Sequence, residues 1–303
     1  MTLLYNFSAP ILKIRDVKKI IGLLVLVCLL TGCYRQDGVD DSSNPVVVGP
    51  AVRGSNMALG NPSGATSDIV NADNYLMNKV QYSLSYNNGK HTANWVSWHL
   101  STAWLGSVDR QDNFRADITL PSSWIAIDTY GFSGSGFDRG HICPSADRTL
   151  SVEDNSATFL MTNMMPQAPN NNQIPWANFE SYCRTLVKSG YELYIVAGPA
   201  GVGGTGSRGY YEKWGDYGIV VPKYTWKVVL AIFNGENDLA RIDTKVRTIA
   251  IWMPNDQAAS KKSWYDYRVS IDEVEANTGF DFFSSIPDDV EKVIEARTDN
   301  AAI

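Results

Sequence analysis

Apolar and polar positions alternate clearly between residues 82 and 100. Tyr82, Leu84 and Tyr86 are separated by polar residues. Asn88-Gly89 then supplies the residues of a tight hairpin turn, and residues 95–100 return as a second apolar run. This pattern predicts two antiparallel strands. Longer apolar runs predict further strands of the same sheet at residues 191–197, 225–233 and 248–253.

Helical spacing appears in the middle of the chain and again near its end. Pro175 suits the first turn of a helix and Gly190 its end. Between them the apolar positions recur every three to four residues: Trp176, Phe179, Cys183, Leu186 and Val187. Two shorter helices are predicted at residues 271–277 and 288–295, with Phe280, Phe282 and Phe283 docking on the core. The Gly-rich run 201–209 lacks the Lys-Ser/Thr of a P-loop, and we interpret it as a flexible loop.

The first 33 residues have the layout of an export signal. A basic stretch precedes an apolar core at residues 20–30, which is too short to span a bilayer. The end of this segment, Leu30-Thr31-Gly32-Cys33, resembles the lipobox of bacterial lipoproteins, which implies cleavage before Cys33 and acylation of its thiol. An ordinary secretory signal or a short membrane anchor is the alternative. Tyr34 and Arg35 follow Cys33 directly, so the aspartate that would hold a lipoprotein at the inner membrane is missing and we expect an outer-membrane anchor.

Residues 34–74 are rich in Gly, Ser, Asn, Asp and Pro, which predicts a flexible tether before a globular domain at residues 75–303. The mature chain would keep 22 basic and 31 acidic residues, a net charge of −9. This charge argues against a stoichiometric nucleic-acid coat but leaves room for a local basic groove. Two cysteines remain after export and acylation, Cys143 and Cys183. We expect a disulfide between them, with two buried free thiols as the alternative.

The densest chemistry lies in residues 137–148. Asp138, Arg139 and His141 are followed by Pro144, so the stretch predicts a strand end that feeds a tight turn. A surface turn with an Asp138–Arg139 ion pair is the structural alternative. Another of the three histidines, His99, shares a strand face with tryptophan and serine, and we interpret it as a packed sheet residue.

A second group of polar residues surrounds the predicted central helix. Asn172 lies just before its start, and Glu180 and Arg184 lie one turn apart on the same face. A helix cap and an i, i+4 salt bridge would explain them structurally. Hydrolysis of a phosphodiester offers a chemical explanation instead, because it needs a base for water, a cation and donors that hold the phosphate. His141 is the natural base, since its ordinary pKa of about 6.5 leaves much neutral imidazole at pH 7.

These residues together resemble the DNA/RNA non-specific endonucleases with a ββα-metal fold. The resemblance covers about residues 75–297. It rests on Asp138-Arg139-Gly140-His141, on residues 162–167 (Thr-Asn-Met-Met-Pro-Gln), and on Asn172 and Glu180 at the family spacing. It implies an α+β fold in which helices pack on the faces of a central antiparallel sheet.

The resemblance also assigns roles. His141 activates the attacking water, and Asn172 is the sole direct protein ligand of Mg²⁺, with Mn²⁺ or another divalent ion as alternatives. Glu180 orients a metal-bound water. The phosphate is held by Arg110, assisted by Arg139 and Arg184. Asp138 orients the local backbone or metal waters, and Asn163 orients His141.

The implied activity is metal-dependent cleavage of DNA and RNA with little sequence preference, leaving 5′-phosphates. A catalytically silent nucleic-acid-binding lipoprotein is the rival interpretation, and a relative that cuts only DNA or only RNA is another. The predicted partners are the nucleic-acid substrates and, through Cys33, a membrane. A homodimer is compatible with the sequence, which identifies no inhibitor protein. If Cys143 and Cys183 were bridged, the disulfide would link the motif turn to the metal-bearing helix.

Overall fold

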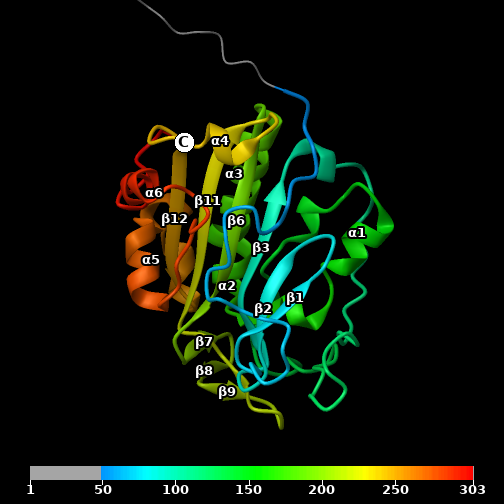
Figure 1. The fold of residues 1–303 in the computed structure, drawn as a ribbon. Coiled ribbons are helices and arrows are strands. Elements are labelled where there is room, and N and C mark those ends of the chain that lie inside the picture. The colour runs from blue at the N-terminus through cyan, green and yellow to red at the C-terminus, as the bar shows by residue number, and fades with distance from the viewer. Residues whose placement is uncertain (1–48, 303) are drawn as a thin grey trace, which may run out of the picture. The chain divides into compact units, whose positions relative to one another are not determined.

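The computed structural model describes residues 49–302 (Figure 1). The predicted signal segment, the acylated Cys33 and residues 34–48 of the predicted tether lie outside the described residues. Within the described part, no helix has the length and apolar character needed to cross a membrane.

A seven-stranded antiparallel sheet forms the centre of the fold (Figure 1). The first three strands are neighbours in both sequence and space. The next strand of the sheet, β6, pairs with β3, and the long segment between these two strands carries the site described below. In spatial order the strands are β1 (Tyr75–Asn78), β2 (Ser83–Asn87), β3 (Thr92–Leu100), β6 (Tyr191–Ala200), β11 (Tyr224–Phe233), β12 (Arg247–Pro254) and β13 (Arg268–Val269). The strands predicted from alternation and from apolar runs are therefore confirmed.

Both faces of this sheet are buried, which explains why its central strands are almost continuously apolar. On one face, β6 contributes Leu193 and Ile195 to a core shared with helix α3 (Ala177–Lys188). On the other, Tyr194 and Val196 pack with α5 (Ile271–Thr278) and α6 (Asp288–Glu295). Phe282 and Phe283 are buried in this second core, as predicted from the sequence.

The excursion between β3 and β6 builds a small ββα unit. Strand β4 (Asp138–His141) pairs antiparallel with β5 (Met164–Gln167), with His141 opposite Met164. Beyond β5 the chain passes through α2 (Pro169–Asn171) and a π-helical turn η4 (Asn172–Trp176) into α3. Gly140 is required in β4, because a Cβ there would lie 2.1 Å from the Gln167 Oε1 atom.

Short elements complete the fold, and the Gly-rich run among them is a correction. Residues 201–209 were expected to be a flexible loop, yet much of this run belongs to a hairpin of β7 (Gly204–Gly206) and β8 (Gly209–Tyr211). The remaining elements are η1 (Thr102–Trp104), η2 (Ser145–Asp147), α1 (Val152–Ala157), η3 (Met161–Asn163), β9 (Lys213–Trp214), β10 (Ile219–Val220), α4 (Asp238–Arg241), η5 (Gln257–Lys261) and η6 (Trp264–Tyr267).

The predicted tether is wrong for residues 49–74, which pack on the sheet. Leu59 and Ala65 are buried in the core beside α5 and α6. The Gly54 amide donates to Nδ1 of His99 at 3.0 Å, and Nε2 of that buried histidine lies 3.0 Å from Glu192. Asn61 closes a turn through two hydrogen bonds with Ala65. A composition rich in Gly, Asn and Pro is typical of tight turns as well as of linkers, and here it serves turns.

Candidate active site

One cleft of about 350 Å³ collects side chains from five separate parts of the chain. The loop after β3, strand β4, the turn η2, the π-helical turn η4 and helix α3 all reach it. Its polar lining comprises Arg110, Arg139, His141, Asn172, Gln173, Glu180 and Ser145. The structure therefore brings together five of the residues selected from the sequence at one place, although they span 70 positions of the chain.

His141 ends strand β4 with its ring held between two aromatic side chains. The ring centroid lies 5.5 Å from that of Phe114 and 4.9 Å from that of Phe159, both edge-on. Burial, together with the nearby positive charges of Arg110 and Arg139, lowers the pKa of His141 to about 3. The ring nitrogen Nε2 is buried and has no hydrogen-bond partner among the described residues. His141 is thus a neutral imidazole with a free nitrogen.

Asp138 orients the two amides that follow strand β5. Its Oδ2 atom accepts hydrogen bonds from Nδ2 of Asn172 and from Nε2 of Gln173, each at 2.9 Å. Because the amide nitrogen of Asn172 donates to Asp138, the Asn172 carbonyl oxygen is left for another partner. Asp138 and Arg139 bind different groups, so the simple ion pair considered from the sequence does not explain Asp138.

Glu180 pairs with a lysine that sequence analysis missed. The carboxylate lies 3.3 Å from Nζ of Lys227, which is buried on β11 and lies 4.1 Å from the centre of the Trp176 ring. Burial raises the pKa of Glu180, and the Lys227 charge opposes that rise. A lysine inside the otherwise apolar run 226–232 was the sequence feature that could have revealed this partner.

Arg184 lies away from the cleft lining. Its guanidinium donates to Oδ1 of Asp147 at 2.9 Å, and Asp147 also accepts from the indole of Trp98 at 3.0 Å. The i, i+4 salt bridge between Glu180 and Arg184 does not form, because each finds a partner distant in sequence. A phosphate contact of Arg184 stays a prediction, and Asp147 is the partner that its guanidinium has in the structure.

Arg110 and Arg139 both line the cleft, and hydrogen bonds to neighbouring hydroxyl groups hold their guanidinium groups in place. Nη1 of Arg110 donates to Ser145 at 2.9 Å, and Nη1 of Arg139 donates to the hydroxyl of Thr129 at 2.9 Å. The Arg139 guanidinium also lies 3.9 Å from the centre of the Phe114 ring. About half of the Arg110 side chain is exposed (49%). These contacts position two cations beside His141 and leave donors free for an anion.

Asn163 acts on the backbone rather than on the imidazole. Its side chain accepts from the Cys143 amide at 2.9 Å and donates to the carbonyls of Cys143 and Thr158. Any effect of Asn163 on the orientation of His141 therefore acts through the backbone. Its three hydrogen bonds instead hold the turn that follows His141.

The expected disulfide is absent, and Cys143 and Cys183 are free thiols. Both are buried in the core between α3 and the sheet. Burial raises the pKa of each thiol to about 12, so neither forms a thiolate at neutral pH. The two residues pack as small apolar groups, which is the alternative that cysteine counting had left open.

Comparisons with known proteins match this fold and this cleft. A family model described as DNA/RNA non-specific endonuclease matches residues 60–289. The chain is 48% identical over 281 residues to a nuclease from Nostoc sp., covering 92% of this chain and 98% of that protein. It is 31% identical to the mitochondrial nuclease EXOG of Xenopus laevis, over 69% of this chain and 58% of that protein. The crystal structure of the EndoG/EndoGI complex matches with a TM-score of 0.63 and 25% identity, over 77% of this chain and 91% of that chain.

The matched region contains the complete cleft, from Arg110 to Glu180, the buried Lys227 that pairs with Glu180, and the ββα unit that carries the cleft. The α+β fold expected from the motifs is confirmed by the solved structure. Proteins of this ββα-metal class are hydrolytic enzymes that depend on a divalent metal. The chain therefore belongs to the DNA/RNA non-specific endonuclease family and is a nuclease.

Proposed function

We propose that this nuclease is a Mg²⁺-dependent endonuclease that cleaves DNA and RNA with His141 as general base and Asn172 as metal ligand. One observation carries the proposal: a neutral His141 with a free Nε2 shares a cleft with an Asn172 amide oriented by Asp138. The 5′-phosphate products are part of the proposal because the family resemblance implies them. Such products form when water attacks the phosphorus and the 3′ oxygen leaves.

His141 would take the proton from the attacking water. A base must be unprotonated before the reaction, and the low pKa of this ring keeps it neutral. Arg110 and Arg139 would hold the phosphate through charge-assisted hydrogen bonds as negative charge develops on its oxygens. The same two guanidiniums that depress the pKa of His141 would thereby bind the substrate.

The residues of the cleft fit a divalent cation. The Asn172 carbonyl oxygen bonds to no described donor, and Glu180 adds a carboxylate to the same cleft. A single neutral protein ligand suits Mg²⁺, which keeps most of its waters; Mn²⁺ accepts similar oxygen ligands. When bound, the ion would neutralise charge on the phosphate and the leaving oxygen. Glu180, held by Lys227, would accept hydrogen bonds from the ion's waters.

A second hollow of about 550 Å³, which Asp138 also lines, adjoins the cleft and shares Arg139 with it. Arg208 and the exposed Tyr130 also line it. A cation and an aromatic ring are suited to the backbone and bases of flanking nucleotides. Contacts of this kind carry little sequence information, which supports the proposed lack of sequence preference.

The direct test compares nicking of a plasmid by the wild-type protein in Mg²⁺ and in chelator, beside His141→Ala. We expect nicking only by the wild type in Mg²⁺. A protein that binds the plasmid without cutting it would support the rival silent binding protein. Parallel digestion of single-stranded DNA, duplex DNA and RNA tests the breadth of substrate, and an end-group assay tests for 5′-phosphates.

We further propose that the protein is exported and anchored in the outer membrane through a lipid on Cys33. The support is the order of basic stretch, apolar core and Leu30-Thr31-Gly32-Cys33. Labelled fatty acid should be incorporated by the wild type and not by Cys33→Ser. Equal labelling of both would contradict the anchor.

A further inference from the structure

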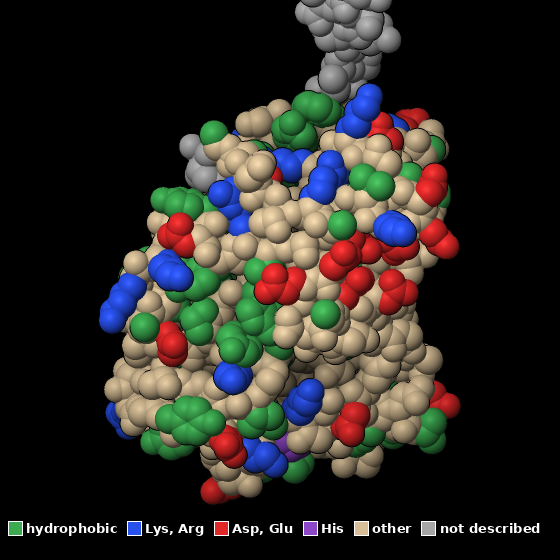
Figure 2. Space-filling view, turned by 90° about the vertical axis from the view of Figure 1, so that its left-hand side faces the viewer, with side chains coloured by type: hydrophobic (Ala, Val, Ile, Leu, Met, Phe, Trp, Pro, Cys, Tyr) green, Lys and Arg blue, Asp and Glu red, His purple; other side chains and the backbone are tan. Residues whose placement is uncertain are grey.

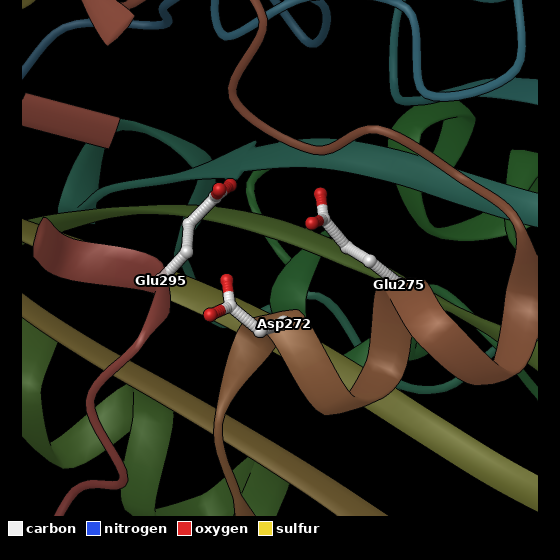
Figure 3. Close-up of side chains that lie close together, drawn as sticks. All are labelled: Asp272, Glu275 and Glu295. Atoms are coloured by element: carbon white, nitrogen blue, oxygen red, sulfur yellow. The ribbon is translucent and has the colours of Figure 1, made fainter. Parts of the chain in front are cut away.

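Three carboxylates meet on the opposite side of the sheet from α3. Asp272 and Glu275 project from α5 and Glu295 from the end of α6, and Figure 3 shows their carboxylates turned toward one another. One oxygen of each lies within 4.8 Å of the others. Acidic side chains also gather on the face of the molecule seen in Figure 2, which is the side of α5 and α6. Like charges converge here from two different helices.

Glu295 has no protein partner that would explain its burial. The residue is only 5% exposed, and its Oε1 atom is buried without a hydrogen-bond donor in the described chain. Oε1 of Glu291, one turn earlier on α6, is in the same situation. An isolated buried carboxylate is costly, so such groups are normally paired or bind a metal. The ion pairs of residues 49–302 all involve other carboxylates.

The surrounding charges make this cost larger. Burial raises the pKa of Glu295 to about 9, and the nearby Glu275, Glu291 and Asp272 raise it as well. The pKa of Glu291 is raised to about 7, again by burial and by carboxylates. A positive charge placed among these groups would relieve both burial and repulsion.

The spacing of the oxygens fits a calcium-sized ion. Ca²⁺ binds oxygens at about 2.3–2.6 Å, so two of its ligands lie at most about 5 Å apart. The limit for Mg²⁺, with ligands at about 2.0–2.1 Å, is about 4.2 Å. The three oxygens lie within 4.8 Å of one another, which is below the limit for Ca²⁺. Ca²⁺ also accepts several carboxylates at once, whereas Mg²⁺ keeps most of its waters. The cluster contains neither His nor Cys, which are the ligands that Zn²⁺ favours.

We propose that Asp272, Glu275 and Glu295 bind a calcium ion that ties α6 to α5. This site is independent of the cleft and of the function proposed for it. Both helices contact β12, and Oε1 of Glu275 also accepts the Phe282 amide at 2.7 Å. The ion would therefore link the two C-terminal helices and the buried phenylalanine loop between them. Its effect would be on stability rather than on catalysis.

The test measures thermal unfolding of the full chain in calcium and in chelator. The Asn172→Ala background removes the proposed metal ligand of the cleft, so that only the second site contributes. At a calcium concentration about 100 times the dissociation constant, we expect the midpoint to rise by about 5 °C. The same concentration of Mg²⁺ should give a smaller rise. Equal midpoints in calcium and chelator would overturn the proposal.

Matched variants locate the site. Glu295→Gln and Asp272→Asn should each abolish the calcium-dependent rise, and Asp272→Asn does so at an exposed side chain, without a change in the buried core. The control is Glu273→Gln, which removes the same charge from an exposed position of α5 outside the cluster. It should keep the full rise. A rise that survives in Asp272→Asn and Glu295→Gln would refute the assignment of these ligands.

Discussion

The carboxylates of the cleft have partners within the protein, whereas those of the acidic cluster (Asp272, Glu275 and Glu295) lack a positively charged partner among the described residues. In the cleft, Asp138 is bound by two side-chain amides and Glu180 by Lys227. In the cluster, Asp272 and Glu295 face each other and other carboxylates without a cation from the protein. Both regions are suited to divalent ions, but only the cleft is charge-balanced by the chain itself.

This difference separates what a metal does in each place. A site whose side chains are already held by protein partners keeps its shape without an ion, so loss of the ion removes chemistry. A site of mutually repelling carboxylates gains stability when the ion binds, so loss of the ion weakens the fold. The comparison therefore predicts that a chelator has two separable effects on this protein.

The largest expected effect is on the base of the cleft. His141→Ala should lower kcat by about 10³-fold or more while leaving the thermal midpoint nearly unchanged, because general-base catalysis contributes about 10²–10⁴-fold. Rates of plasmid nicking and a melting curve check both parts. His91→Ala, at the half-buried hairpin turn, is the control and should retain full activity. Full activity in His141→Ala would remove this residue from the mechanism.

The second-largest expected effect is on metal-dependent cleavage, through Asn172 and the Asp138 that binds its amide. Asn172→Ala should cripple cleavage, and Asp138→Ala should raise the Mg²⁺ concentration for half-maximal activity by about 10- to 100-fold, because partners that orient a ligand contribute at that level. A Mg²⁺ titration of activity measures this shift. An unchanged titration curve in both variants would show that this cleft edge does not hold the ion.

Removal of one charge should have opposite consequences in the two regions. Lys227→Met leaves Glu180 buried and unpaired, and should cost about 3 kcal/mol of unfolding free energy. Lys223→Met, at an exposed position before the same strand, is the control and should cost little. Denaturant unfolding measures both. A negligible loss in Lys227→Met would mean that the charge balance of the cleft does not depend on this lysine.

In the acidic cluster, removal of an ionisable group should raise the unfolding free energy instead of lowering it. With its pKa raised to about 9, Glu295 must take up a proton to stay buried at neutral pH. Glu295→Gln removes this cost, and in chelator should raise the unfolding free energy at neutral pH by about 1 kcal/mol. The same denaturant experiment in EDTA checks it. A clear loss of stability in chelator would show that Glu295 has a stabilising partner in the protein and would remove the contrast with the cleft.

The smallest effect is on the titration of His141. Because the folded ring stays unprotonated while the unfolded chain takes up a proton, this residue lowers the unfolding free energy as the pH falls from 7 to 5. The folded pKa of His141 lies below its ordinary value of 6.5, so the ring binds no proton between pH 7 and pH 5, where an ordinary histidine does. The chain has only three histidines, so ring ¹⁵N chemical shifts can be assigned with the His141→Ala variant. A His141 midpoint near 6.5 would contradict the protected neutral base.

Local sequence was sufficient for the strands, the main helix and the identity of the chemical groups. Alternation predicted β2 and β3, and the spacing from Trp176 to Val187 predicted α3, because these patterns depend on a period of two or 3.6 residues. The motif around His141 and the following Asn172 and Glu180 predicted the family and the contents of the cleft. Those residues are close together in the chain or occur at a characteristic spacing.

The tertiary structure alone decided which groups are partners. Lys227 reaches Glu180 across 47 positions and Asp147 reaches Arg184 across 37, so the local i, i+4 pair was the wrong guess. Only packing in the folded core shows that Cys143 and Cys183 stay apart as thiols, or that residues 49–74 dock on the sheet. Glu275 and Glu295 meet because two helices pack on one face. Such contacts depend on how distant segments fold together, which a pattern along the chain does not encode.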